Sequence, residues 1–344
     1  MRKIIIAIAL VFMLATSSFA FSNHVRWSFK AEAPITSGIA ANENYVFFGD
    51  GSGRCYALNN SGRPVWLHNG LGSVIGTPVI ANDRVVFVRS DGNVTCLKIS
   101  DGSVIWDNDT SHDASGQDTA PDGAAIGDGK VFVSKGDGVL HALNLNDGRP
   151  VWTYKSEIEL RSAPSFGEKL VFLGEYNGIL SILDPKDGSR IGGGGAGGAI
   201  NTLAIKNGTA YASSWDGSVQ AFKIKDIIPL WNVKLGDPVT TKPEVNNGMI
   251  AVGTARGLVV ALDEKSGNIL WRFSSDAGNI NAKPVIADGF VFAPTSNGVY
   301  VLDGNSGRDR ALIFADEGGS DSSPAFVNGV LYVGCNSGAV YAVN

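Results

Sequence analysis

The chain of 344 residues has few of the side chains from which catalytic and metal centres are built: three cysteines, three methionines and four histidines. The histidines, at positions 24, 68, 112 and 141, share no spacing, and the motifs Cys-x-x-Cys, His-Glu-x-x-His and Gly-x-Ser-x-Gly do not occur. The sequence therefore shows no machinery of a zinc enzyme or an ordinary hydrolase. This absence favours a protein that is not an enzyme, without deciding the question.

Basic residues are also fewer than acidic ones, with 28 Lys and Arg against 33 Asp and Glu. The formal net charge is −5 at pH 7, and an acidic surface attracts neither phosphate backbones nor acidic lipids. The composition argues against nucleic acid or an anionic membrane as a partner.

The three cysteines, Cys55, Cys96 and Cys335, are odd in number and follow no common spacing. An oxidising compartment would permit one disulfide among them, but the spacing does not demand one. We expect buried, unpaired strand residues that behave as small apolar side chains, with a single disulfide as the alternative.

Long hydrophobic runs are missing except near the start of the chain. Arg2 and Lys3 precede an apolar run from Ile4 to Leu14, and the small residues around Ala20 suit a cleavage site. We therefore predict a signal peptide over residues 1–20 and a single domain over residues 21–344. The run is short for a membrane anchor, and no later run is long enough for a transmembrane helix. The expected product is a soluble exported protein, periplasmic or extracellular.

Tryptophan and glycine, by contrast, recur with a period of about forty residues. The tryptophans are Trp27, Trp66, Trp106, Trp152, Trp231 and Trp271, and four of these six follow a turn glycine by four residues. The turn glycines at this place in the repeat are Gly62, Gly102, Gly148, Gly188, Gly267 and Gly307. A second glycine series has steps of 39 to 46 residues: Gly53, Gly92, Gly138, Gly178, Gly217, Gly257, Gly298 and Gly338. Both series indicate eight repeats. Gly192 and Ala311 stand where a tryptophan is due, and Ile227 stands where a glycine is due.

Within one repeat the pattern is that of β-strands. In the sixth repeat, short runs rich in β-branched residues begin at Lys242, Met249, Leu258 and Ile269, and turn sequences that end in glycine separate them. Four strands of about five residues with their turns need about forty residues, the size of one propeller blade. The sequence predicts an all-β protein, an eight-bladed β-propeller of four-stranded antiparallel blades.

The two ends of the chain favour a closed ring over an open solenoid. The last repeat stops after its third strand, Ala339 to Val343, and a single strand, Val25 to Phe29, precedes the first repeat. An open stack would leave both strands as unpaired edges, whereas in a ring the N-terminal strand completes the last blade.

Two loops resemble ligand sites on first inspection. The third repeat has about six extra residues in the segment 107–123, where Asp107, Asp109 and Asp113 are closely spaced, but His112 and Asp118 stand where an EF-hand needs glycine and glutamate. We expect a solvated polar loop there. The glycine run 192–198 lies between two β-blades, without the helix that a phosphate cradle requires, so we expect a flexible or closely packed connection.

Two features around the fourth and fifth repeats predict a contact surface. Tyr176 and Trp215 occupy corresponding turns, where the other repeats have small or polar residues; burial against an adjacent loop is the alternative. In the loop leading into the fourth blade, Ile158 and Leu160 stand beside Arg161, a pattern that fits an interaction hot spot. The alternative is the start of a strand with Leu160 turned inward.

The pattern Ala-Leu-Asp/Asn, three residues, Gly, three residues, Trp resembles the repeat of pyrroloquinoline quinone (PQQ) propellers over the whole chain after residue 20. In those proteins the tryptophan docks against a turn of the neighbouring blade. One group with this repeat is the quinoprotein dehydrogenases, which carry calcium ligands and often adjacent cysteines. No two cysteines are adjacent in this chain. Lys242 and Lys283 each precede a proline at the start of the innermost strand of a blade, and they would face the cofactor if PQQ and calcium bound.

The other group is the BamB family of periplasmic outer-membrane assembly factors. The chain resembles it in the closing strand and in Ile158, Leu160 and Arg161, which match a Leu-x-Leu-Arg loop before Ser-Ala-Pro that holds the barrel subunit in that family. Two features differ: no lipoprotein cysteine follows residue 20, and the glycine-rich segment before the fifth repeat lacks the family's acidic residue.

This resemblance implies a non-enzymatic interaction scaffold that needs no cofactor and binds another envelope protein in outer-membrane β-barrel assembly. Ile158, Leu160, Arg161, Tyr176 and Trp215 are its predicted contact residues. A PQQ-dependent dehydrogenase or PQQ-binding sensor is the alternative. The sequence leaves the oligomeric state open.

Overall fold

The computed structural model describes residues 24–109, 119–135, 138–158, 160, 162–195, 198–314 and 317–344. The predicted signal peptide, residues 1–20, lies outside this part of the chain, as do Arg161 and residues 110–118 of the polar loop. No helix in the described ranges is long and apolar enough to cross a membrane.

The described residues form thirty-two β-strands in eight antiparallel groups of four, which we number as blades 1 to 8. Blade 1 contains β2 (Ala40–Ala41), β3 (Tyr45–Gly49), β4 (Cys55–Asn59) and β5 (Pro64–His68), and blade 2 contains β6 (Val74–Ala81), β7 (Arg84–Arg89), β8 (Asn93–Lys98) and β9 (Val104–Asp109). Blade 3 contains β10 (Thr119–Gly127), β11 (Lys130–Lys135), β12 (Val139–Asn144) and β13 (Pro150–Lys155), and blade 4 contains β14 (Ser165–Gly167), β15 (Leu170–Gly174), β16 (Ile179–Leu183) and β17 (Arg190–Gly195).

Blade 5 contains β18 (Ile200–Lys206), β19 (Thr209–Ser214), β20 (Ser218–Lys223) and β21 (Ile228–Lys234), and blade 6 contains β22 (Glu244–Asn246), β23 (Met249–Gly253), β24 (Leu258–Asp263) and β25 (Ile269–Ser274). Blade 7 contains β26 (Val285–Ala287), β27 (Phe290–Thr295), β28 (Gly298–Asp303) and β29 (Asp309–Ile313), and blade 8 contains β30 (Ala325–Val327), β31 (Val330–Gly334), β32 (Ala339–Val343) and β1 (Val25–Lys30). The all-β prediction is confirmed, and the strands of blade 6 begin within two residues of the predicted runs.

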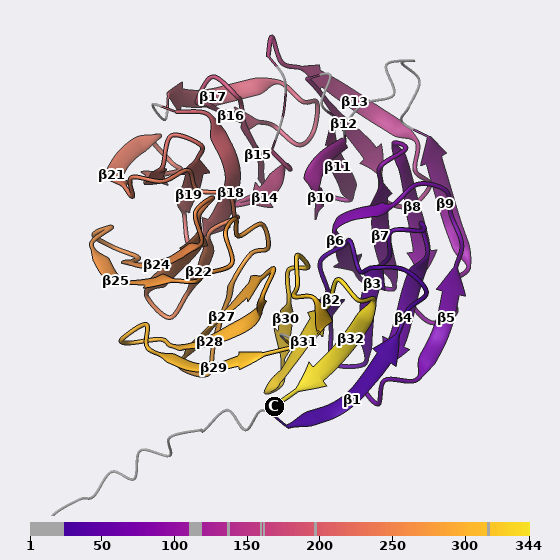
Figure 1. The fold of residues 1–344 in the computed structure, drawn as a ribbon. Helices are drawn as coiled ribbons and strands as arrows, with labels where there is room; N and C mark the ends of the chain where they lie inside the picture. The colour runs from indigo at the N-terminus through magenta and orange to yellow at the C-terminus, as the bar shows by residue number, and fades with distance from the viewer. Residues whose placement is uncertain are drawn as a thin grey trace, which may run out of the picture.

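The blades stand around a central opening, as Figure 1 shows, with the first strand of each blade innermost and the fourth at the rim. The innermost strands contact one another in sequence from β2 through β6, β10, β14, β18, β22 and β26 to β30, and β30 in turn contacts β2. Blades 2 and 3 are also joined by a parallel bridge between Thr77 and Gly123, which makes them one eight-stranded sheet.

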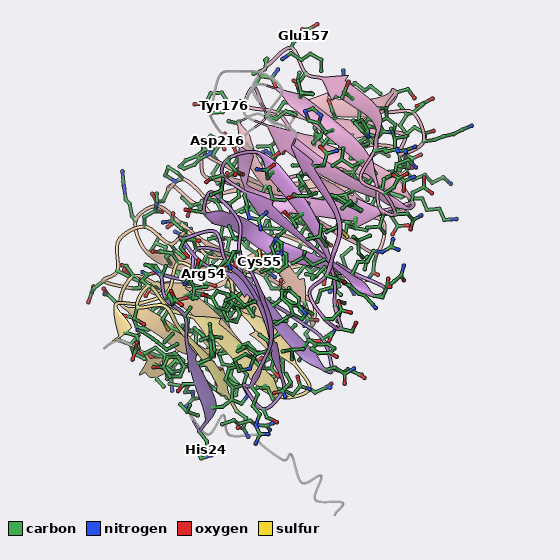
Figure 2. The ribbon with its side chains drawn as sticks, turned by 90° about the vertical axis from the view of Figure 1, so that its right-hand side faces the viewer. His24, Arg54, Cys55, Glu157, Tyr176 and Asp216 are labelled. Carbon is green, nitrogen blue, oxygen red and sulfur yellow. The ribbon has the colours of Figure 1, made fainter. Side chains whose placement is uncertain are left out.

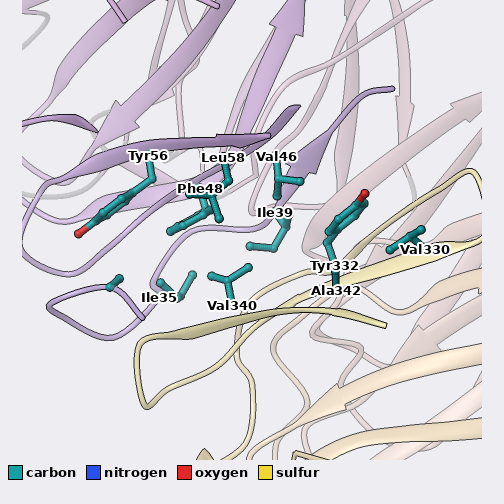
Figure 3. Close-up of a cluster of buried hydrophobic side chains, with 11 residues drawn as sticks. Ile35, Ile39, Val46, Phe48, Tyr56, Leu58, Val330, Tyr332, Val340 and Ala342 are labelled. Atoms are coloured by element: carbon teal, nitrogen blue, oxygen red, sulfur yellow. The ribbon is translucent and has the colours of Figure 1, made fainter. Parts of the chain in front are cut away.

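The two ends of the chain meet in blade 8. β1 pairs antiparallel with β32, and His24 and Asn344 exchange two backbone hydrogen bonds of 3.2 Å. Apolar side chains of blades 8 and 1 pack together beside this junction, among them Tyr332 and Val340 from one blade and Val46 and Phe48 from the other (Figure 3). The burial of this cluster stabilises the contact between the first and last repeats.

Each tryptophan of the repeat lies in an outer strand and packs against the turn of the next blade. A Cβ atom at any of the six turn glycines would come within 2.5–2.7 Å of an indole ring, and the six residues have φ between +67° and +75°. The indole nitrogen of each tryptophan donates a hydrogen bond of 2.7–3.3 Å to a carbonyl in the same turn. Glycine is therefore required twice, because of the left-handed backbone and because the ring occupies the space of a side chain.

The exceptions to this repeat have structural explanations. Gly192 stands in place of tryptophan in β17, and Ile227 stands in place of glycine in the next turn; the Cδ1 atom of Ile227 lies 2.7 Å from where a Cβ of Gly192 would be. At this contact the strand residue is the small one and the turn residue is the large one, so Ile227 fills the space that an indole ring occupies elsewhere. Ala311 faces blade 8, where β32 and β1 come from opposite ends of the sequence and no turn joins them.

The glycine run differs from the expectation of a connection. Gly192 to Gly195 belong to β17 and pair in register with β16, which supplies the backbone hydrogen bonds that compensate for the low strand propensity of glycine. The cysteines follow the expectation: Cys55, Cys96 and Cys335 are free and buried, although Cys335 directly follows β31 instead of lying within it. Burial raises the pKa of each thiol to about 12.

Candidate functional site

At several blades of the described part of the chain, the turn between the second and third strands packs against the loop that leads into the next blade, on one face of the ring. In blade 3, the Ser156 amide donates a 2.8 Å hydrogen bond to the Gly138 carbonyl, and a Cβ at Gly138 would lie 2.9 Å from the Ile158 carbonyl. This contact fixes the start of the loop that contains the predicted Leu-Arg motif.

Within that loop, the predicted contact residues lie in different environments. Leu160 is fully buried and packs with Phe132, Leu140 and Leu173 between blades 3 and 4, which is the inward orientation considered as the alternative. Ile158 is half-buried, and its amide hydrogen-bonds to the Ser156 hydroxyl at 3.2 Å. Arg161 lies outside the described residues. Of the predicted contact residues in this loop, therefore, Leu160 contributes packing and Ile158 is partly exposed.

Tyr176 and Trp215 are exposed, with 47% and 44% of their surfaces accessible. Tyr176 lies in the turn between β15 and β16, and Trp215 in the turn between β19 and β20. Large aromatic side chains at turn tips present apolar surface with few rotatable bonds, which is the property that binding sites use.

Gly198 holds these two aromatic turns close together. A Cβ at Gly178, in the Tyr176 turn, would lie 2.7 Å from the Gly198 carbonyl, and a Cβ at Gly198 would lie 2.2 Å from the carboxyl carbon of Asp216. The Trp215 amide also donates a hydrogen bond to the Ala199 carbonyl at 3.1 Å. Figure 2 shows Tyr176 and Asp216 beside each other at one edge of the molecule. The close packing explains glycine at position 198, since any side chain would separate the turns.

Asp216 fixes the conformation of the Trp215 turn. Its carboxylate accepts hydrogen bonds from the Ser218 amide at 2.9 Å and from the Lys234 ammonium at 2.8 Å. Burial alone would raise the pKa of Asp216, but the hydrogen bonds from Lys234 and Ser218 lower it to about 2. The carboxylate is therefore ionised at neutral pH and anchors the turn beside Trp215.

Sequence reasoning found the two aromatic residues but missed Asp216, Gly198 and Lys234. Lys234 and Asp216 are eighteen residues apart and meet because β20 and β21 pair antiparallel. The signal in the sequence was a Trp-Asp pair followed by the turn glycine, a combination that the other seven repeats do not show.

The two lysines predicted to face PQQ under the alternative function lie elsewhere, in the central opening of the ring. Lys242 and Lys283 both line a cavity there, and the Lys283 ammonium forms an ion pair of 2.6 Å with Glu244. Among the described residues, no cluster of three or more His, Cys, Asp or Glu side chains is arranged to hold a metal ion. Thus the structure places the partner-contact candidates and the cofactor candidates in two separate regions.

Comparison with known families decides the classification. The family model described as outer membrane protein assembly factor BamB matches residues 20–121, 115–192 and 215–344. The chain belongs to the BamB family.

Individual BamB proteins are similar over most of the chain. Outer membrane protein assembly factor BamB of Yersinia pestis is 25% identical over 302 residues, which cover 83% of this chain and 74% of that protein. The crystal structure of BamB from Moraxella catarrhalis has a TM-score of 0.77 at 19% identity and covers 93% of this chain and 98% of its own.

The fold itself is shared more widely than the family. Sqt1 of Saccharomyces cerevisiae has a TM-score of 0.76 at 14% identity and covers 94% of this chain and 99% of its own. A propeller of this shape therefore does not by itself identify a function. The sequence match to BamB carries the classification.

Proposed function

We propose that this chain is a non-enzymatic periplasmic scaffold in the assembly of outer-membrane β-barrel proteins. Membership of the BamB family supports the proposal, because the family model matches most of the chain and its description names outer membrane protein assembly. The scarcity of catalytic side chains is consistent with a scaffold.

The partner-binding surface in this proposal consists of Tyr176, Trp215 and Ile158, on the face formed by the loops and turns of blades 3 to 5. Two exposed aromatic residues on turns locked by Gly198 and Asp216 supply a preorganised apolar contact, so that little side-chain entropy is lost on binding. Leu160 supports the loop from beneath through its burial between blades 3 and 4. Arg161 belongs to the surface by its place in the sequence motif.

A paired substitution tests this surface. The variant Tyr176→Ala with Trp215→Ala is expected to weaken the binding of an envelope partner at least tenfold, because exposed aromatic hot spots contribute about 2 kcal/mol or more each. Affinity purification of the tagged chain from envelope extracts, followed by titration of the purified partner, measures the effect. Substitutions at Leu160 cannot serve here, because an inserted charge would destabilise the core between blades 3 and 4.

Val65→Ala with Leu67→Ala is the matched control. Both side chains are exposed on β5 at 39% and 49%, comparable with the aromatic pair. The control variant should bind the partner as the unmodified chain does. Unchanged partner binding by the Tyr176 and Trp215 variant, with an unchanged melting temperature, would contradict the assignment of the surface.

A further inference from the structure

The turn between the second and third strands of blade 6 contains an arginine where the other blades have short polar residues. From blade 1 to blade 8, the residue before the turn glycine is Ser52, Asp91, Asp137, Asn177, Asp216, Arg256, Asn297 and Ser337. Four of the short side chains accept a hydrogen bond from the backbone amide two residues ahead: Asp91, Asn177, Asp216 and Ser337. An arginine side chain cannot accept this bond, so the turn itself does not explain Arg256.

Arg256 is held by a buried carboxylate of the loop that leads into blade 6. Its amide donates a hydrogen bond of 2.9 Å to Asp237 Oδ2, and its guanidinium Nε lies 3.6 Å from Asp237 Oδ1. The Asp237 side chain is 4% exposed, whereas the Arg256 side chain is 81% exposed. Among the described residues, no hydrogen bond engages the two terminal nitrogens of this guanidinium. The group is therefore attached by one edge and presents the other to solvent.

The same loop connects Arg256 with the aromatic turn of blade 5. A Cβ at Gly217, two residues after Trp215, would lie 2.9 Å from the Asp237 carbonyl oxygen. Asp237 thus touches the Trp215 turn with its backbone and Arg256 with its side chain. Arg256 continues the series of turns that presents Tyr176 in blade 4 and Trp215 in blade 5.

The other charged groups of these loops do not occupy the exposed edge of Arg256. The Lys234 ammonium pairs with Asp216 at 2.8 Å, and the Arg272 guanidinium donates a hydrogen bond of 3.2 Å to a backbone carbonyl of the loop that leads into blade 6. Asp276 is exposed in the loop that leads into blade 7, and in the described ranges no ion pair joins it to Arg256.

We propose that Arg256 binds a carboxylate of the envelope partner, beside the apolar contact of Tyr176 and Trp215. The inference rests on the proposed function and adds the chemistry of the partner, an apolar segment with an acidic side chain next to it. A guanidinium offers paired N–H groups that match the two oxygens of a carboxylate, and attachment to Asp237 reduces the side-chain entropy lost on binding. Tyrosine, tryptophan and arginine are the residue types enriched among binding hot spots.

Titration of the purified envelope protein that co-purifies with the tagged chain tests the proposal. Arg256→Gln should weaken its binding about tenfold and make the binding less dependent on salt concentration. Arg256→Lys should restore only part of the affinity, because an ammonium keeps the charge but not the fork of donors.

Arg149→Gln is the matched control. The Arg149 side chain is 85% exposed, and its Nε lies 3.8 Å from the Asp147 carboxylate. It belongs to the turn between β12 and β13, on the opposite face of the ring. This variant should bind the partner as the unmodified chain does.

A double variant separates contact with the partner from support of the loop. Arg256→Gln leaves the buried Asp237 carboxylate without its ion pair, which by itself can destabilise the loop. Arg256→Gln with Asp237→Asn removes both charges and should bind as weakly as Arg256→Gln alone. Full recovery of binding in the double variant would show that Arg256 acts through Asp237 and not on the partner.

Zero-length coupling locates the carboxylate of the partner. In the Arg256→Lys variant, a carbodiimide should join the introduced amine to an aspartate or glutamate of the partner through an amide bond. Mass spectrometry of the digested adduct identifies the two joined residues. Arg149→Lys should give no such adduct.

Three further results would overturn the proposal: unchanged binding by Arg256→Gln, no coupled adduct from position 256, or a loss of binding to phosphatidylglycerol vesicles but not to the protein in Arg256→Gln. In each case the proposed function stands if Tyr176→Ala with Trp215→Ala still weakens partner binding. A chain that binds no envelope protein contradicts both.

Discussion

The exchange of Gly192 and Ile227 permits a direct test of how the blades are held together. Gly192→Trp alone places an indole where Ile227 already lies, with Cδ1 2.7 Å from the new Cβ, and overpacking of this kind costs about 1–3 kcal/mol. Ile227→Gly alone removes a half-buried side chain but also relieves a left-handed backbone at φ +52°, worth about 1–2 kcal/mol for a residue with a Cβ. The second variant should therefore have nearly the stability of the original chain.

Together the two substitutions restore the pair found at the other blade contacts. The new indole can pack on the glycine introduced at position 227 and donate to the Ile224 carbonyl, the position that corresponds to Leu145 in the Trp106 contact. We expect the double variant to be more stable than the sum of the single variants by about 2 kcal/mol. Urea unfolding of the four proteins, monitored by tryptophan fluorescence and circular dichroism, measures this coupling. Additive effects would refute the claim that the two residues occupy one shared site.

Four further predictions concern single residues. Trp106→Phe should destabilise the chain by about 1 kcal/mol or more, measured by urea midpoint, because the Leu145 carbonyl loses an indole donor at 2.9 Å. Gly195→Lys should change stability by less than about 0.5 kcal/mol, since among the described residues no atom outside its chain neighbours lies within 4 Å of its Cβ position. Gly193→Ala should cost about 1–3 kcal/mol, because its Cβ would lie 2.4 Å from the Leu180 carbonyl oxygen. Equal effects of the two substitutions would contradict this account of β17. Gly198→Ala should separate the aromatic turns and weaken partner binding at an unchanged fold, which circular dichroism and partner titration distinguish. The pKa of Asp216 is lowered from 3.8 to about 2, so the contribution of its carboxylate to stability is complete above about pH 4 and is lost as the pH falls to about 2. Asp216→Asn should remove this part of the acid dependence of stability. An acid unfolding curve that the substitution leaves unaltered would count against this role of Asp216.

Most of the fold could be predicted from the sequence because one periodic contact generates it. Each tryptophan that packs on a turn glycine needs that glycine in the next blade, so both residues repeat visibly along the chain. The exceptions are visible in the sequence as irregularities, but their pairing is not. Gly192 and Ile227 are thirty-five residues apart, and only the arrangement of neighbouring blades shows that one compensates for the other.

The candidate site was less predictable, since exposure depends on the packing of loops from different blades. Leu160 and Trp215 are both large apolar residues near blade starts or turns, yet one is fully buried and the other is 44% exposed. Residue type does not distinguish these outcomes. The difference comes from the core between blades 3 and 4, which accepts Leu160, and from the Asp216 turn, which holds Trp215 at the surface.

Site-specific photocross-linking tests the central claim most directly. A photoreactive phenylalanine analogue is introduced at position 176 or 215, and at Val65 on the rim as the control, and the cells are irradiated before the envelope proteins are identified by mass spectrometry. The account predicts covalent adducts to a component of the outer-membrane assembly machinery from positions 176 and 215, and none from position 65. Adducts to that component from position 65 alone, or the same yield from all three positions, would contradict it.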